Sequence, residues 1–274
     1  MAKAPGRSSP VVSLVAAFTI VLAIYPTWLG AIDLKDIESR GSIRALVSAD
    51  EQPEMFALVS DPAAPGFERE ILDGFAKAHG LKVEVVTVPN FEQIIPKRLK
   101  GDGALIIGII DTETRRRQID FTIETLPARH LVVNRKPAAP LEAADVKRAH
   151  FGVIQGTSWA EAAATAGVPA TNTSSFPDLF AVLGALQAGK VAATVMSAPD
   201  FALAQRHDAG LQAGVFIGAP DSAAWGLRKT DKQLEDALND HIFSMRGSVA
   251  WRQLVGKYFT PEALELFRRA RKTQ

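Results

Sequence analysis

The sequence predicts an α/β fold, because short β-branched runs alternate with longer stretches of helical periodicity along most of its length. Its 274 residues exceed one minimal core and suit either one large domain or two small ones. Apolar residues make up 47% and charged residues 22%, which supplies a buried core and argues against a disordered chain. We therefore expect a globular protein of mixed helices and strands.

The individual elements follow from local patterns. Short apolar runs rich in β-branched residues predict strands at 42–47, 82–88, 104–110, 131–133, 151–153 and 191–195. Apolar residues at helical spacing predict helices at 67–79, 91–99, 158–166, 176–188, 232–245, 249–258 and 261–271. Gly80 and Gly101 are expected to end the first two helices.

Two stretches have the composition of breaks between parts of a fold. Residues 134–140 are rich in proline and alanine, and residues 213–227 are rich in glycine and other small residues. They bracket a middle block that could form a separate lobe inserted into the first. Such stretches also occur as plain surface loops, so composition alone leaves both interpretations open.

The N-terminal segment has the pattern of an export signal. Lys3 and Arg7 precede residues 11–25, which carry no charge, and Leu29-Gly30-Ala31 follows as a possible processing site. Residues 1–31 are therefore expected to be a signal peptide, with an uncleaved membrane anchor through 11–25 as the alternative. Either interpretation places the body outside the cytoplasm, in the periplasm.

Charge and composition exclude several classes of function. The net charge of +1 gives no broad positive field for a phosphate backbone, so we expect no nucleic-acid partner. The absence of cysteine removes disulfides, thiolate metal sites and cysteine nucleophiles. No two of the five histidines have the spacing of metal ligands on one helix, and no cofactor is expected. Isolated histidines such as His130 and His207 are interpreted as surface or hinge residues.

Six blocks carry a family resemblance: 66–71, Gly101, 112–122, 155–158, 185–191 and 228–234. In order and spacing, from about residue 41 to 259, they resemble the family 3 extracellular solute-binding proteins, the polar amino-acid receptors of bacterial importers. The resemblance implies a type II periplasmic-binding-protein fold, in which each lobe is a mostly parallel sheet flanked by helices and two hinge strands join the lobes. It places lobe 1 at 32–133 and 222–274, lobe 2 at 137–218, and the hinges near 131–136 and 215–228.

The basic run at 115–117 contains a candidate anion-binding residue. The guanidinium of Arg115 matches a carboxylate in two parallel hydrogen bonds, which a lysine cannot make. Thr112, one helical turn earlier, could add its hydroxyl, and the resemblance implies that both positions contact a ligand carboxylate. The alternative is that Arg115, beside Arg116 and Arg117, belongs to a solvated basic face.

Residues 156–158 form a turn before a predicted helix. Ser158 and Glu161 have the spacing of a capping box, and open amides at a helix start also bind anions. The resemblance implies that Thr157 and Ser158 contact the ligand carboxylate from the lobe opposite Arg115. Only closure would make both sets of contacts, so the ligand would stabilise the closed state.

Departures from the family pattern bear on the ligand. The family usually places an aspartate at the position of Ser197, where it pairs with the α-ammonium group of an amino acid; Ala104 and Ile110 likewise replace polar residues. An ammonium buried without a carboxylate costs on the order of a few kcal/mol, enough to lose one or two decades of affinity, so a standard α-amino acid is doubtful. Asp50, Glu51 and Asp200 could instead hold a distant positive group, or be solvated loop acids.

The expected function is therefore an exported receptor that closes on a small carboxylate ligand and delivers it to the membrane subunits of an ABC importer. We expect it to act as a monomer and not as an enzyme. One alternative is a ligand-sensing accessory module. A less favoured one is an enzyme resembling cyclohexadienyl dehydratase, with an acid near Asp200 as general acid.

Overall fold

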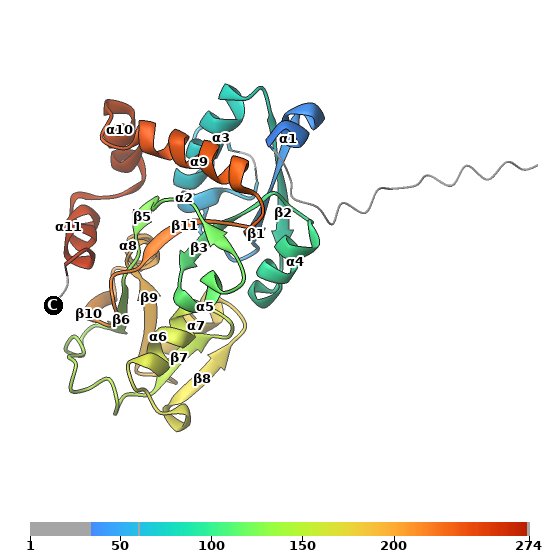
Figure 1. The fold of residues 1–274 in the computed structure, drawn as a ribbon. Helices are drawn as coiled ribbons and strands as arrows, with labels where there is room; N and C mark the ends of the chain where they lie inside the picture. The colour runs from blue at the N-terminus through green and yellow to red at the C-terminus, as the bar shows by residue number, and fades with distance from the viewer. Residues whose placement is uncertain (1–33, 60, 273–274) are drawn as a thin grey trace, which may run out of the picture.

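A computed structural model describes residues 34–59 and 61–272, and the predicted signal or anchor segment 1–31 lies outside them. The described chain forms two α/β lobes, each built on one sheet with helices against it (Figure 1). The predicted two-lobed α/β fold is confirmed. Among the described residues, no helix combines the length and the apolar character needed to cross a membrane.

Each lobe has a single sheet. The sheet of lobe 1 has the order β2 (Lys82–Val88), β1 (Ser42–Ser48), β3 (Leu105–Asp111), β11 (Ser222–Leu227) and β4 (Asp120–Phe121), with β5 (Leu126–Pro127) also paired to β11. The sheet of lobe 2 has the order β10 (Leu211–Phe216), β6 (His130–Arg135), β9 (Ala193–Ser197), β7 (Phe151–Ile154) and β8 (Thr173–Phe176).

Strand direction differs within each sheet. β1 is parallel to β2 and β3, and β7 is parallel to β8 and β9. β11 is antiparallel to its three neighbours, and β6 is antiparallel to β9 and β10. The family resemblance implied mostly parallel sheets. Each sheet keeps parallel pairs but is mixed, because the strands that adjoin the crossings between lobes run antiparallel to their neighbours.

Helices cover the sheets. Lobe 1 carries α1 (Leu34–Arg40), α2 (Pro53–Phe56), α3 (Phe67–Ala78), the 3₁₀ turn η1 (Phe91–Gln93), α4 (Ile94–Lys100), α5 (Glu113–Arg116), α9 (Lys232–Met245) and α10 (Val249–Tyr258). Lobe 2 carries α6 (Ser158–Thr165), the turn η2 (Ala170–Asn172), α7 (Leu179–Gln187) and α8 (Ala198–His207). The apolar stripe of α3 is buried as its spacing predicts, and Phe67 packs edge-on against Trp251 of α10 at 5.4 Å between ring centroids.

The chain crosses between the lobes at 128–129 and at 217–221. The two crossings lie side by side: the Ala128 amide donates to the Asp221 carbonyl at 2.8 Å, and the Ile217 amide donates to the His130 carbonyl at 2.9 Å. The first crossing therefore comes before the predicted hinge near 131–136, because residues 131–135 belong to β6 of lobe 2.

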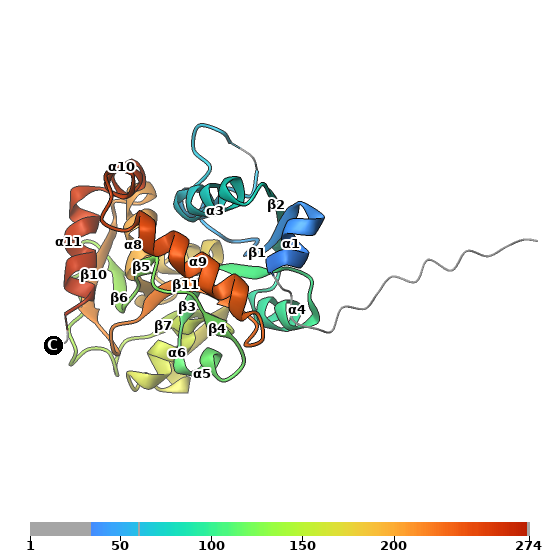
Figure 2. The ribbon, with the colours of Figure 1, turned by 45° about the horizontal axis from the view of Figure 1, so that its top comes forward.

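The glycine-rich stretch at 213–227 is mostly the two strands β10 and β11. Its small residues serve close packing: a Cβ on Gly214 would lie 2.6 Å from the Leu141 carbonyl oxygen, and a Cβ on Gly226 would lie 2.9 Å from Ile119 Cδ1. The last helix, α11 (Pro261–Ala270), packs against α8 of lobe 2, although the sequence assigned all of 222–274 to lobe 1 (Figures 1 and 2).

Candidate functional site

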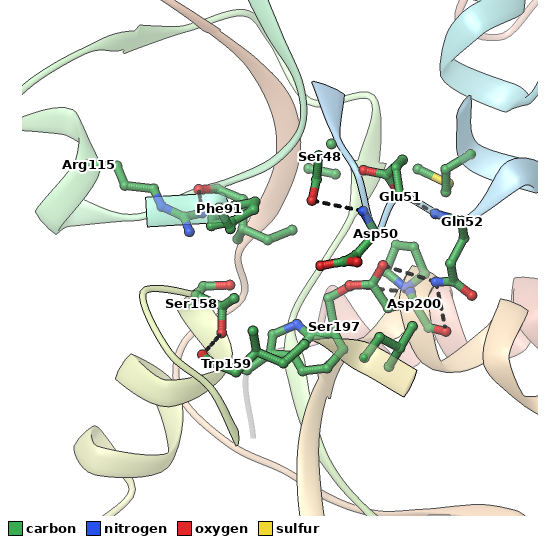
Figure 3. A pocket seen from close by; sticks show the side chains of 18 residues that line it. Ser48, Asp50, Glu51, Gln52, Phe91, Arg115, Ser158, Trp159, Ser197 and Asp200 are labelled. Carbon is green, nitrogen blue, oxygen red and sulfur yellow. Dashed lines mark hydrogen bonds between the residues drawn. The ribbon is translucent and has the colours of Figure 1, made fainter. Parts of the chain in front are cut away.

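A cavity of about 790 Å³, counting the part open to solvent, lies where the two lobes meet (Figure 3). Seven of the eight predicted site residues line it: Asp50, Glu51, Arg115, Thr157, Ser158, Ser197 and Asp200. Residues that sequence reasoning did not assign to the site also line it, notably Gln52, Phe91, Gly108 and Trp159. Arg115 and Ser158 lie at one end of the cavity, and Glu51, Gln52 and Asp200 lie at the other (Figure 3).

Arg115 is buried in the wall of the cavity, whereas its neighbours Arg116 and Arg117 are exposed. Its Nη1 donates to the Ile110 carbonyl at 2.8 Å, and its Cζ lies 5.3 Å from the centre of the Phe91 ring. Burial lowers the pKa of Arg115 to about 10, while Glu161, Asp221 and Asp111 favour its charged form. It is therefore charged at neutral pH, and this burial contradicts a solvated basic face.

Thr112 was expected to contact the ligand, but the structure places it outside the cavity. Thr112 does not line the cavity; it is the N-cap of α5, and its hydroxyl accepts a hydrogen bond from the Arg115 amide at 3.3 Å. A short helix with a satisfied first turn fixes the backbone from which Arg115 projects. The hydroxyl thus supports Arg115 from behind.

The start of α6 forms the lobe 2 wall next to Arg115. Its N-cap is Thr157, whose hydroxyl donates to the Ile154 carbonyl at 2.7 Å and does not cap the helix. Ser158 is the first residue of the helix, so the predicted capping box with Glu161 is absent. The first amides of α6 are therefore free of side-chain caps and carry the positive end of the helix dipole.

Three acidic side chains line the other end. Burial raises the pKa of Glu51 well above its usual range, with repulsion from Asp200 and Glu68 adding to the shift. Burial also raises the pKa of Asp200, against hydrogen bonds from Ser197 and Gln52. Asp50 is exposed, and its pKa is raised by partial burial and then by Asp178. Charged together and desolvated, these groups repel one another.

The Ser197 hydroxyl is hydrogen-bonded to Asp200 within lobe 2. It donates to Asp200 Oδ2 at 2.5 Å and accepts from the Asp200 amide at 3.3 Å as the N-cap of α8. Gln52 of lobe 1 donates through Nε2 to the carboxylate oxygen Oδ1 and to the carbonyl oxygen of Asp200, each at 3.3 Å. These hydrogen bonds join the two lobes across the cavity and hold the Asp200 carboxylate in place.

Gly108 makes room for Glu51. It has a φ of +68°, and a Cβ there would lie 2.0 Å from Glu51 Oε2, so a side chain would displace that carboxylate. The Gly108 amide donates to Oε2 of the fully buried Glu68 at 2.9 Å, and Thr125 donates to Oε1 at 2.9 Å. A glycine inside an apolar strand was the available sequence signal.

His130 was interpreted as a surface or hinge residue, and the structure places it at the crossing but buries it, at 2% exposed. Its Nε2 lies 2.9 Å from Ser158 Oγ, and its Nδ1 lies 3.0 Å from Asp221 Oδ2. Within residues 34–59 and 61–272, no group of three or more histidine and acidic side chains is arranged to hold a metal ion.

Comparisons with known proteins agree with this architecture. Residues 43–261 match the family model of the bacterial extracellular solute-binding proteins, family 3. A probable histidine-binding protein of Neisseria gonorrhoeae is 22% identical over 81% of this chain and 85% of its own length. Membrane-bound lytic murein transglycosylase F of Pseudomonas syringae pv. tomato is 22% identical over 71% of this chain, and the chain spans only 41% of that relative.

Solved structures show the same fold. An amino acid ABC transporter substrate-binding protein of Streptococcus pneumoniae, bound to L-arginine, superposes with a TM-score of 0.71 at 19% identity over 82% of this chain and 96% of that chain. The ancestral amino acid-binding protein AncCDT-1, a precursor of cyclohexadienyl dehydratase, has a TM-score of 0.71 at 22% identity over 82% and 99% of the two chains. Because the family model covers most of the two lobes, the chain belongs to the bacterial extracellular solute-binding proteins, family 3.

Proposed function

We propose that this protein is an exported receptor that closes on a small ligand with a carboxylate at one end and a separate cationic group at the other, and delivers it to the membrane subunits of an ABC importer. The observation that carries the proposal is the division of the cavity by charge. A buried arginine lies at one end and the acidic side chains of Glu51 and Asp200 lie at the other (Figure 3).

The environment of Arg115 favours a ligand carboxylate at that end of the cavity. Among the described residues, no carboxylate oxygen lies within 4.0 Å of its guanidinium, so its buried charge has no directly paired counter-ion, although Glu161, Asp221 and Asp111 act on it from farther away. A ligand carboxylate would supply that counter-ion in two parallel hydrogen bonds. The uncapped amides of α6 face the same end from lobe 2, which favours an anion held by both lobes.

The raised pKa values of Glu51 and Asp200 favour a cationic group of the ligand at the other end. Desolvated acids that repel one another gain most from a cation placed between them, because it favours the ionised form of both. Ser197 supplies no carboxylate where the family pairs an α-ammonium group. We therefore expect acids with a distant cation, such as 4-guanidinobutanoate or 5-aminopentanoate, to bind at least as well as L-arginine.

Contacts between the lobes support closure as the mechanism. Gln52 of lobe 1 reaches Asp200 of lobe 2, and Glu54 Oε1 lies 2.7 Å from His207 Nε2. A ligand that spans the cavity binds Arg115 and Glu51 from lobe 1 and α6 and Asp200 from lobe 2. Its binding energy therefore favours the closed arrangement over the open one.

A thermal-shift screen tests the proposal. The panel contains 4-guanidinobutanoate, 5-aminopentanoate, L-arginine, L-histidine, glycine betaine, simple dicarboxylates and neutral sugars. A ligand at a hundredfold over its dissociation constant stabilises the folded protein by about 2.7 kcal/mol, which gives a clear shift. Arg115→Ala should remove most or all of the shift, and Arg116→Ala, on the exposed side of the same helix, should keep it. Failure of every carboxylate to bind would overturn the proposal.

A ligand-sensing accessory module is the second candidate. The observation that favours it is that this chain matches only 41% of a membrane-bound transglycosylase, in which the matching part is joined to other sequence. Retention of residues 1–31 in the exported protein, read from its mass, would favour that role, and their loss would favour a free receptor.

An enzyme related to cyclohexadienyl dehydratase is the third. Its supporting observation is the raised pKa of Asp200, which suits a general acid. Turnover of prephenate that is lost in Asp200→Asn would establish it, and prephenate that is left unchanged would exclude that substrate.

A further inference from the structure

Three residues that are distant in sequence form one hydrogen-bonded chain behind the Arg115 end of the cavity. Asp221 Oδ2 lies 3.0 Å from His130 Nδ1, and His130 Nε2 lies 2.9 Å from Ser158 Oγ. His130 and Ser158 are 2% and 3% exposed, and Ser158 also lines the cavity. This series of hydrogen bonds connects both crossings between the lobes to the start of α6.

The direction of each hydrogen bond follows from the chemistry of the groups. An ionised Asp221 only accepts, so it places a proton on His130 Nδ1. In the neutral imidazole Nε2 then has no proton and accepts one from the Ser158 hydroxyl, which is the order of donors found in serine hydrolases. The Ser158 oxygen consequently presents only lone pairs to the cavity.

Protonation of His130 reverses the second bond. The imidazolium carries a proton on Nε2 and donates it to Ser158 Oγ, so the Ser158 hydroxyl proton is released. That hydroxyl can then donate to an anion in the cavity. One proton on a buried side chain therefore changes Ser158 from an acceptor to a donor toward the ligand.

We propose that His130 is a positioning residue that sets the hydrogen-bond polarity of Ser158, so that a carboxylate ligand binds with uptake of a proton at His130. The inference rests on the proposed function, because it requires the ligand carboxylate to lie at the Arg115 end. A carboxylate next to Ser158 is repelled by a lone pair and stabilised by a donated proton, so it favours the imidazolium.

The charged groups around His130 bear on the sign of this coupling. Asp221 contacts it directly, and Asp200 of α8 interacts with it electrostatically. Arg115 interacts with Asp221 and with Glu161 of α6. The cationic end of the ligand has the opposite effect on the number of protons bound. A cation favours the ionised forms of Glu51 and Asp200, so its binding releases protons.

A matched pair of probes separates the two ends. 4-Guanidinobutanoate and its carboxamide share a guanidinium that keeps its charge between pH 6 and 8, and only the first has a carboxylate. Isothermal titration in buffers of different ionisation enthalpy measures the protons exchanged on binding. We expect the acid to take up more protons than the amide, and its affinity relative to the amide to rise from pH 8 to pH 6, by at most about tenfold per pH unit for one coupled proton.

Two variants and a control test whether the extra protons are bound at His130. His130→Gln should make the numbers of protons taken up with the acid and with the amide equal. Ser158→Ala keeps the bond between His130 and Asp221 and should lower the excess of protons that the acid takes up over the amide. His241→Gln, a half-buried histidine of α9 that contacts the Ile71 carbonyl at 3.1 Å, should leave the excess unchanged. In the ligand-free protein at pH 8, nitrogen NMR should show the proton of His130 on Nδ1.

The outcomes are distinct. Binding of the acid with equal proton counts for acid and amide, or an excess that persists in full in Ser158→Ala, would overturn the inference and leave the proposed function intact. A proton on Nε2 at pH 8 would do the same without any ligand. If neither the acid nor L-arginine binds at all, the proposed function fails and this inference fails with it.

Discussion

Two arginines of lobe 1, Arg98 and Arg115, are both buried but have different surroundings. Arg98 is fully buried and pairs with Asp231, whose Oδ2 also lies 3.3 Å from Arg228 Nε. Arg115 is 4% exposed, and its guanidinium donates to a backbone carbonyl and stacks on Phe91. Burial lowers the pKa of each to about 10. A buried charge that is directly paired with an internal counter-ion therefore holds the fold together, whereas a buried charge with no acid in direct contact is suited to an anion from outside.

Removal of the counter-ion of Arg98 should have the largest effect on stability. Asp231→Ala leaves a fully buried guanidinium without a carboxylate and is expected to lower the free energy of unfolding by about 3–5 kcal/mol. Urea denaturation at pH 7 measures the change. Asp236→Ala, an exposed acid on the same helix α9, is the control and should change stability by less than about 0.5 kcal/mol. Equal stability of the two variants would show that the pair of Arg98 and Asp231 does not stabilise the fold.

Arg115→Ala should show the opposite division of effects. We expect it to weaken binding of 4-guanidinobutanoate by about 2–5 kcal/mol, because the ligand carboxylate loses its buried partner. The ligand-free protein should keep its stability, since no internal ion pair is broken. Calorimetry and urea denaturation report the two quantities separately. A loss of stability as large as that of Asp231→Ala would show that Arg115 is a structural residue after all.

Glu68 tests whether a buried acid without a cation weakens the fold. Burial raises the pKa of Glu68 from 4.5 to about 7, so the folded protein keeps a proton that the unfolded chain releases. Stability should therefore fall as pH rises from 4.5 to about 7 and stay lowered above that. Glu68→Gln should make this dependence smaller, leaving the part that Glu51 and Asp200 contribute, and raise stability at pH 8 by at most about 3 kcal/mol.

Urea denaturation at pH 5 and pH 8 measures the effect of Glu68→Gln. Glu70→Gln is the control on the same helix α3; it loses an ion pair with Lys257 and should gain nothing at pH 8. A wild-type protein that is no less stable at pH 8 than at pH 5 would contradict the prediction.

Thr112 should give the smallest effect. Because its hydroxyl caps α5, Thr112→Ala is expected to lower stability by about 0.5–2 kcal/mol and affinity only modestly, and Thr112→Ser should restore both. Denaturation and calorimetry of both variants measure these changes. A loss of affinity equal to that of Arg115→Ala, at unchanged stability, would instead show direct contact of Thr112 with the ligand.

The local sequence pattern predicted an element well where apolar residues recur at regular spacing along it. The helices at 232–245 and 249–258 and the strand at 82–88 have the predicted bounds, because their apolar spacing is set by the face that they bury. The helix expected at 176–188 begins only at Leu179, after the strand β8, and the short strands β4 and β5 had no distinct pattern. The first crossing was placed too late, since a proline-rich loop after β6 resembles a break between lobes.

The sequence alone determined the α/β class, most of the long elements and the kinds of side chain available to a site, because these follow from periodicity and residue chemistry. Tertiary structure decided which charges have partners. Arg98 and Arg115 look alike in sequence, and only the fold brings Asp231 to the first and leaves the second facing a cavity. Likewise, nothing local joins Ser158 to His130 and Asp221. The physical reason is that hydrogen-bond partners are set by contacts between segments far apart in the chain, which local spacing does not encode.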